Sequence, residues 1–114
     1  YQVDGDAEKI VTLVRLAAEM GADIIKADPT SNPEDFHRVV EAARVPVLVR
    51  GGGKEDLRTV LMKSAALLAQ GANGMVYGRN IYQHENPGAV VRALMAMIHD
   101  GADGDAAWDV YNRG

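Results

Sequence analysis

The sequence predicts an α/β fold built on a parallel sheet. Three short apolar runs, at residues 22–27, 45–49 and 74–77, indicate strands. Amphipathic helical patterns alternate with these runs along the chain. Alternation of this kind calls for a parallel sheet with right-handed crossovers. Periodicity alone leaves two architectures open, an open doubly wound sheet and a closed barrel.

The first predicted helix covers residues 7–20, and Gly21 follows it where a left-handed helix end favours glycine. Its apolar residues recur at helical spacing: Ile10, Leu13, Val14 and Ala17. The apolar run 22–27 comes next and is interrupted only by Lys26. We expect this run to form a strand that is buried on both faces.

The second predicted helix begins at Asn32-Pro33-Glu34-Asp35, which combines an N-cap, a proline at the first helical position and two acidic residues. The strand at residues 45–49 is followed by three glycines. A third amphipathic helix begins near Leu57 and stops at Gly71.

The last part of the chain continues the alternation. A short helix is expected at residues 81–83, after the third strand, and Asn86-Pro87 repeats the cap-plus-proline pattern before a longer helix. Residues expected to face inward on that helix are Val90, Val91, Leu94, Met95 and Ile98. Residues 103–114 form a C-terminal tail with one more short helix. We expect residues 1–114 to be a single partial domain.

Composition argues against several classes of function. The net charge of -4 gives no sign of nucleic-acid affinity, and no window approaches the roughly 20 apolar residues of a membrane span. We expect a cytoplasmic protein without nucleic-acid or membrane partners. The absence of cysteine excludes thiol catalysis and thiolate metal sites. His37, His84 and His99 lack ligand spacing, so we expect no metal and no cofactor.

Functional groups in parallel α/β folds gather at the carboxyl ends of strands, and the first strand carries Lys26 near that end. A buried ammonium group is costly unless it is paired or loses its proton. A neutral lysine can attack a carbonyl and form a Schiff base. The alternative is an ion pair with Asp28, which alternation places on the same side of the strand.

The ends of the other two strands suggest an anion site. Gly51-Gly52-Gly53 can expose backbone N–H groups to a ligand, although three glycines also fit a plain flexible turn. Gly78 permits a second close approach, and the Arg79 guanidinium can grip two phosphate oxygens.

Three motifs together resemble a known family. Gly21–Lys26, Pro46–Val49 with Gly51–Lys54, and Gly78–Gln83 resemble, in order and spacing, the last three βα units of the archaeal-type class I (Schiff-base) fructose-bisphosphate aldolases. These enzymes belong to the DeoC/FbaB-like aldolase superfamily, and the same family contains the autoinducer phosphate thiolase. The match covers nearly the whole chain from about Ala7. The resemblance implies the C-terminal part, about strands six to eight, of a (β/α)8 TIM barrel, and therefore a piece of a longer protein.

The resemblance also implies roles for residues. Lys26 would form the Schiff base on strand six, and the substrate phosphate would be held by Gly51, Gly52, Gly78 and Arg79. Gly53 and Lys54 are further candidates, and Lys54 either assists the phosphate or is only solvated.

Two residues depart from the family pattern. Arg50 stands where the family often has a small residue, so it either meets extra negative charge or bridges to a neighbouring loop. Asp28 lies in a stretch often occupied by threonine or aromatic residues. This carboxylate would oppose activation of the amine unless it shuttles protons to the carbinolamine.

The expected function is that of a carbon-carbon lyase in carbohydrate metabolism, acting on a phosphorylated ketose or a related sugar phosphate. A coenzyme A-dependent thiolase acting on a phosphorylated diketone and a non-catalytic phosphosugar-binding module are the alternatives. Family aldolases take an acid/base tyrosine and a carboxylate from earlier strands, so we expect little turnover from this chain alone. Family resemblance also suggests a homo-oligomer.

Overall fold

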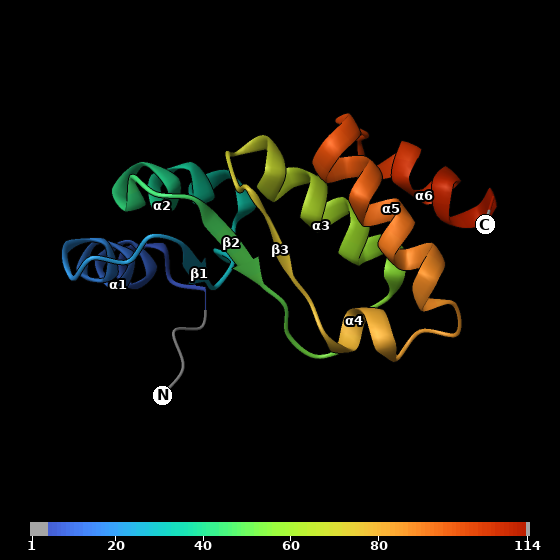
Figure 1. Ribbon diagram of the computed structural model, residues 1–114, viewed down its shortest axis with the longest axis horizontal. Helices are drawn as coiled ribbons and strands as arrows, with labels where there is room; N and C mark the ends of the chain where they lie inside the picture. Colours follow the sequence, from blue (N-terminus) through green and yellow to red (C-terminus); the bar gives the residue numbers. More distant parts are fainter. Residues whose placement is uncertain (1–4, 114) are drawn as a thin grey trace. The chain divides into compact units, whose positions relative to one another are not determined.

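The computed structural model describes residues 5–113 (Figure 1). Contacts divide the chain into two compact units. The first unit comprises residues 1–50 and 67–76, and the second comprises residues 51–66 and 77–114. The elements, in chain order, are α1 (Ala7–Glu19), β1 (Ile25–Ala27), the 3-10 helix η1 (Pro33–Asp35), α2 (Phe36–Ala43), β2 (Val47–Arg50), α3 (Leu57–Ala69), β3 (Gly74–Val76), α4 (Arg79–Tyr82), α5 (Pro87–Asp100) and α6 (Gly104–Arg113).

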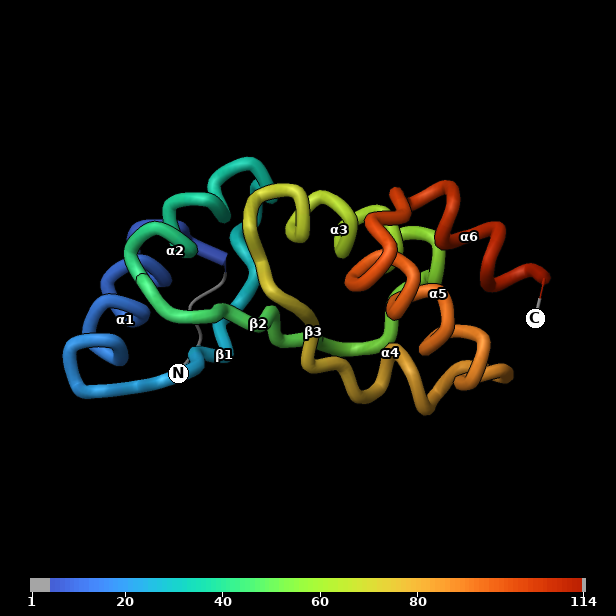
Figure 2. Tube along the Cα trace, turned by 45° about the horizontal axis from the view of Figure 1, so that its top comes forward, coloured from blue at the N-terminus to red at the C-terminus, as the bar shows by residue number. Residues whose placement is uncertain are grey.

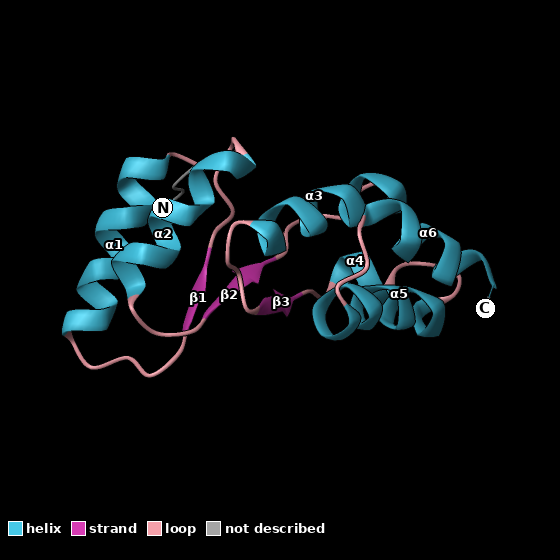
Figure 3. Cartoon of the chain, turned by 90° about the horizontal axis from the view of Figure 1, so that it is seen from above, coloured by secondary structure: helices cyan, strands magenta, loops and turns pink. Residues whose placement is uncertain are grey.

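A three-stranded parallel sheet forms the centre of the first unit, as the sequence predicts. The strand order is β1-β2-β3, so each strand pairs with the next one along the chain (Figure 3). In the register, Lys26 stands opposite Leu48, and Leu48 stands opposite Gly74. Arg50 stands opposite Val76, one pleat further along the sheet.

Helices α1 and α2 lie side by side and supply the apolar layer that packs on one face of this sheet (Figure 2). Asp6 caps α1 through its side chain, and Gly21 follows the helix with a φ of 97°, in the left-handed region that favours glycine. The core joins the two helices to the sheet through Ile10, Val14, Ile25, Ala27, Phe36, Val39, Ala43, Val47 and Val49. The helix end predicted from Gly21 is confirmed, whereas Asn32 caps the 3-10 helix Pro33–Asp35, and the α-helix itself begins at Phe36.

The other face of the sheet is open, and here the prediction of a strand buried on both faces is wrong. Ile25 and Ala27 are buried, whereas Lys26 between them is exposed. Arg50 and Val76 are exposed as well, and Leu48 is half-buried. We call the set Lys26, Leu48, Arg50 and Val76 the open face. Burial on both faces needs two packed layers, and α1 and α2 cover only one side of this sheet.

The second unit draws its buried apolar residues from α3, α5 and α6, and α5 and α6 pack on each other. The Asn86 side chain caps α5 by accepting a hydrogen bond from the Ala89 N–H, as the sequence predicts. The short helix predicted at residues 81–83 is α4, which begins two residues earlier, at Arg79. The expected tail helix is α6, which has its buried Ala107 in the middle. Within residues 5–113 no helix has the length and apolar character that crossing a membrane demands.

Two inward-facing assignments from the helical spacing are wrong, because Val91 and Met95 are 42% and 47% exposed on α5. The buried stripe of α5 instead follows the same spacing through a smaller residue, as Val90, Ala93, Leu94 and Met97. Alanine contributes little hydrophobicity to a sequence pattern, but its small side chain allows close packing of the helix.

Candidate active site: a lysine on the open sheet face and a glycine–arginine cradle

Strand β1 fixes the position of Lys26. Its neighbours across the sheet are Leu48 and Gly74, which carry no charge. Gly74 makes room for Leu48, since a Cβ added there would lie 3.3 Å from the Leu48 Cδ2 atom. No other residue in the described part of the chain forms an ion pair or side-chain hydrogen bond with Lys26. The ε-amino group therefore has no counter-ion among residues 5–113.

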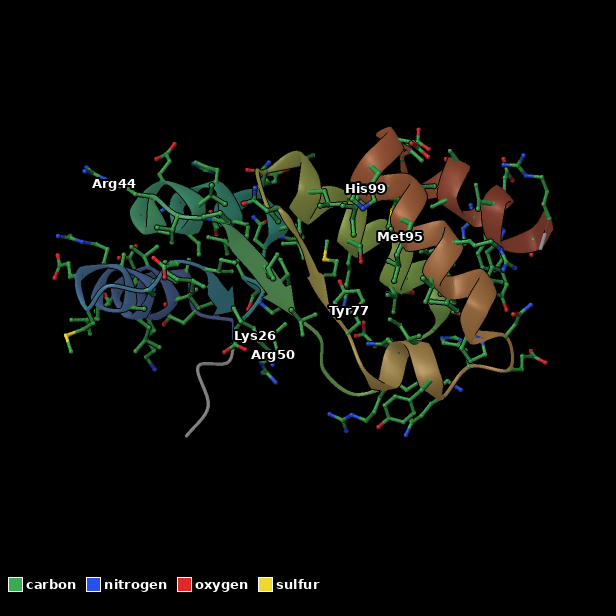
Figure 4. The ribbon with its side chains drawn as sticks, viewed as in Figure 1. Lys26, Arg44, Arg50, Tyr77, Met95 and His99 are labelled. Carbon is green, nitrogen blue, oxygen red and sulfur yellow. The ribbon has the colours of Figure 1, made fainter. Side chains whose placement is uncertain are left out.

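The carboxylate of Asp28 is paired with Arg50. The Arg50 Nε–H donates to Asp28 Oδ1, and the two side chains are 53% and 26% exposed. The alternative in which Asp28 pairs with Lys26 is therefore wrong. The other alternative for Arg50, a bridge to a neighbouring loop, is what the structure shows, because Asp28 begins the loop after β1. Figure 4 shows Lys26 and Arg50 at the same end of the sheet.

The glycine turn and Arg79 lie together in the second unit. A Cβ on Gly53 would stand 4.0 Å from the Arg79 Nη1 atom, so the guanidinium lies beside this turn. A Cβ on Gly52 would meet nothing within 4 Å, whereas one on Gly51 would lie 2.8 Å from Cδ1 of Tyr77. Arg79 is exposed and pairs with no carboxylate of residues 5–113. The turn thus leaves an accessible backbone and a free cation next to each other.

Asn80 holds the glycine turn, and the sequence reasoning gave it no role. Its side chain is 5% exposed. Oδ1 accepts a hydrogen bond from the Glu55 N–H at 2.8 Å, and Nδ2 donates to the Gly53 carbonyl at 3.3 Å. A carboxamide can do both at once because it has a donor and an acceptor on one planar group. The sequence feature that could have indicated this role is an amide side chain directly after Arg79, in a short helix that follows a strand.

Gly78 precedes α4 and accepts hydrogen bonds at its carbonyl from the N–H groups of Ile81 and Tyr82, at 2.8 and 3.0 Å. The predicted phosphate residues Gly78 and Arg79 are thus held by one helical turn. Lys54 behaves differently. It lines a pocket of about 410 Å³ in the second unit together with His84, Trp108 and Tyr111, and that pocket includes none of the predicted phosphate glycines.

Tyr77 packs against the glycine turn at Gly51. Its hydroxyl is 2.7 Å from Ser64 Oγ, and Ser64 is fully buried on α3. Burial raises the pKa of the Tyr77 phenol above its ordinary value of 10.0, the hydrogen bond with Ser64 opposes this shift, and the nearby charge of Glu55 adds to it. Tyr77 is therefore a neutral packing residue at physiological pH, in contact with both α3 and Gly51.

Comparison with known proteins identifies the family. The family model described as DeoC/LacD family aldolase matches residues 1–84. The chain belongs to this family. It is 41% identical over 102 residues to a 2-amino-3,7-dideoxy-D-threo-hept-6-ulosonate synthase from Halobacterium salinarum, covering 90% of the chain and 38% of the relative. It is 38% identical over 97 residues to a 3-hydroxy-5-phosphonooxypentane-2,4-dione thiolase from Shigella flexneri, covering 85% and 37%.

Solved structures agree with this assignment. An archaeal fructose 1,6-bisphosphate aldolase superposes with a TM-score of 0.83 at 32% identity, covering 89% of the chain and 41% of that structure. A second archaeal fructose-1,6-bisphosphate aldolase, with a TM-score of 0.80 and 31% identity over 86% of the chain and 40% of that structure, has its catalytic lysine covalently bound to the carbinolamine intermediate. The chain spans about two fifths of the length of these relatives.

Proposed function

We propose that the chain carries the Schiff-base lysine and the phosphate site of an aldolase acting on a phosphorylated ketose or a related sugar phosphate. The observation that carries this proposal is Lys26, an amine on the open face of the sheet that no carboxylate of the described chain neutralises. Family membership and the Schiff-base aldolases among the similar structures support it. The strands would correspond to about strands six to eight of a TIM barrel.

The chemistry assigned to Lys26 requires its side chain to react as a neutral amine. The nitrogen attacks the ketone carbon, the carbinolamine loses water, and the resulting iminium accepts the electron pair when the neighbouring C–C bond breaks. The product leaves after hydrolysis restores the amine. The required general acid and base are proposed to lie outside this chain, so adduct formation is expected from the chain and turnover is not.

The phosphate is assigned to a cradle formed by the Gly51–Gly53 turn together with Gly78 and Arg79. Two observations support this assignment. The Arg79 guanidinium lies beside Gly53, and two hydrogen bonds join the Asn80 side chain to Gly53 and Glu55. Backbone N–H groups and one guanidinium suit a phosphate dianion, because both donate hydrogen bonds and the guanidinium adds charge. Lys54 is left out of the cradle, because it lines a different pocket.

The test is borohydride reduction of the chain in the presence of dihydroxyacetone phosphate, followed by mass mapping of the adduct. We expect one reduced adduct, on Lys26, and its loss in Lys26→Met. Lys54→Met is the matched control, since it removes an exposed lysine three residues from Gly51 and should leave the adduct unchanged. Stabilisation by phosphate without any adduct would contradict the aldolase proposal and favour a non-catalytic binding module.

The thiolase relatives favour one second candidate, an acyl transfer to coenzyme A from a phosphorylated diketone. Their identity to this chain, 38%, is close to the 41% of the synthase. Both chemistries use the same lysine and phosphate cradle in this proposal. They separate on product analysis of a complete enzyme that includes this chain, because only the thiolase requires coenzyme A as acceptor.

A further inference from the structure

We propose that Arg50 is a positioning residue for the Lys26 amine. By pairing with the carboxylate of Asp28, Arg50 leaves Lys26 without a counter-ion among the described residues. The inference rests on the proposed function of Lys26 as the nucleophile. It assigns to the Arg50–Asp28 pair a role in the reactivity of that lysine. Neither residue has to contact the substrate for this role.

The placement of the three groups carries the inference. Asp28 follows Lys26 by two residues, so strand alternation directs both side chains to the same side of the sheet. Arg50 lies on the open face of β2, one pleat beyond the residue that stands opposite Lys26. Along β3, Gly74 and Val76 stand opposite Leu48 and Arg50, and neither carries a charge. Among the described residues on this side of the sheet, Asp28 is thus the carboxylate placed to neutralise Lys26, and Arg50 is the cation paired with it.

Charge and burial explain why the choice of partner matters. Asp28 is 26% exposed, so its carboxylate has lost much of its water and needs a cation. Arginine satisfies it with a permanently charged guanidinium, whereas lysine would do so only in its protonated form. An ammonium group paired with a carboxylate cannot attack a carbonyl. The Arg50 guanidinium therefore neutralises Asp28, which would otherwise pair with the ammonium form of Lys26.

The experiment measures how fast Lys26 reacts with pentane-2,4-dione, a neutral carbonyl probe, in the chain of 114 residues at neutral pH. The amine attacks one carbonyl carbon, water leaves, and the product is a conjugated enaminone that can be followed by absorbance and located by mass mapping. In Arg50→Gln we expect labelling of Lys26 to be about tenfold slower, because the unpaired carboxylate of Asp28 favours the ammonium form, which does not attack a carbonyl.

Two further variants separate positioning from a structural role. Adding Asp28→Asn to Arg50→Gln removes the competing carboxylate, so the rate should return to within about twofold of the parent. Arg50→Lys keeps a cation for Asp28 and should retain most of the rate. Circular dichroism and thermal unfolding confirm that each variant is folded before its labelling is compared.

Each outcome bears on a different statement. Equal labelling of the parent and Arg50→Gln would overturn the positioning role while leaving Lys26 as the proposed nucleophile. Slow labelling that persists in Arg50→Gln/Asp28→Asn would also overturn it, because the loss would then reflect damaged structure. If the probe does not react at Lys26 of the parent, the proposed function fails, and the inference fails with it.

Discussion

The two units of this chain hold their proposed functional groups in different ways. The first unit places charged side chains, Lys26 and Arg50, on strands whose backbone is fixed by a parallel sheet and an apolar core. The second unit offers backbone groups of a glycine turn and one guanidinium, and a single buried amide, Asn80, holds that turn. The position of the proposed nucleophile thus depends on secondary structure, whereas the proposed phosphate cradle depends on a few polar contacts that one substitution can remove.

The largest expected effect lies in the core of the first unit. Phe36 is fully buried beneath the sheet, so Phe36→Ala should lower the free energy of unfolding by about 3–5 kcal/mol. The control is Leu16→Ala on α1. Leu16 is 52% exposed, so this variant should lower the free energy of unfolding by less than about 0.5 kcal/mol. Denaturant titration measures both. Similar losses in the two variants would contradict the helix-on-sheet core described for this unit.

The next effect concerns the support of the cradle. Asn80→Ala removes two hydrogen bonds and leaves the Glu55 N–H and the Gly53 carbonyl without their side-chain partner, which should cost about 2–3 kcal/mol. It should also abolish thermal stabilisation by inorganic phosphate. Gln83→Ala removes an exposed amide that immediately follows α4 and should change neither. Full phosphate stabilisation in Asn80→Ala would show that the turn does not depend on this amide.

A pair of neighbouring glycines gives a smaller and sharper test. In Gly51→Ala the new methyl group would stand 2.8 Å from the Tyr77 ring, so we expect a loss of about 1–3 kcal/mol from overpacking. Gly52→Ala meets open space and should change stability by less than about 0.5 kcal/mol. Thermal unfolding of both variants checks the difference. A reversed order would mean that Tyr77 does not lie beneath Gly51.

The smallest expected effect is a change in alkaline stability. Burial raises the pKa of Tyr77 above 10.0, so the unfolded chain ionises this phenol first as pH increases. The stabilisation from Tyr77 is therefore complete below pH 10.0, and it is lost as the pH rises through the higher pKa that Tyr77 has in the folded chain. Tyr77→Phe should cost about 0.5–1.5 kcal/mol near neutral pH, through the lost Ser64 bond, and should flatten the alkaline decline. Tyr82→Phe, at an exposed site, should leave the decline unchanged.

Sequence patterns predicted the order of the elements and the parallel sheet, because capping residues and glycines act locally. Asn86 caps α5 and Gly21 ends α1 as expected, since each depends on a few neighbouring residues. The candidate site was predicted less completely. The Lys26 run was expected to be buried on both faces, but burial depends on which elements pack on a strand, and an apolar run does not specify that. The roles of Lys26 and the cradle residues stay predictions.

Asn80 and Arg50 show what local patterns cannot provide. The bond from Asn80 to Glu55 joins residues 25 positions apart, and the pair of Arg50 and Asp28 joins residues 22 apart. Such partners meet only after the strands have paired. The sequence reasoning identified both Arg50 and Asp28 as unusual residues but could not decide between their alternatives.

The short parallel sheet has a further consequence for handling the protein. Both β1 and β3 are edge strands, because among residues 5–113 only β2 is paired on both sides. Edge strands present unpaired N–H and C=O groups that can template the addition of another strand. Exposed Ile24 and Val76 add apolar surface near these edges. Protein concentration is therefore a variable to control when the reactivity of Lys26 is measured, because strand addition along β1 would change the surroundings of the amine.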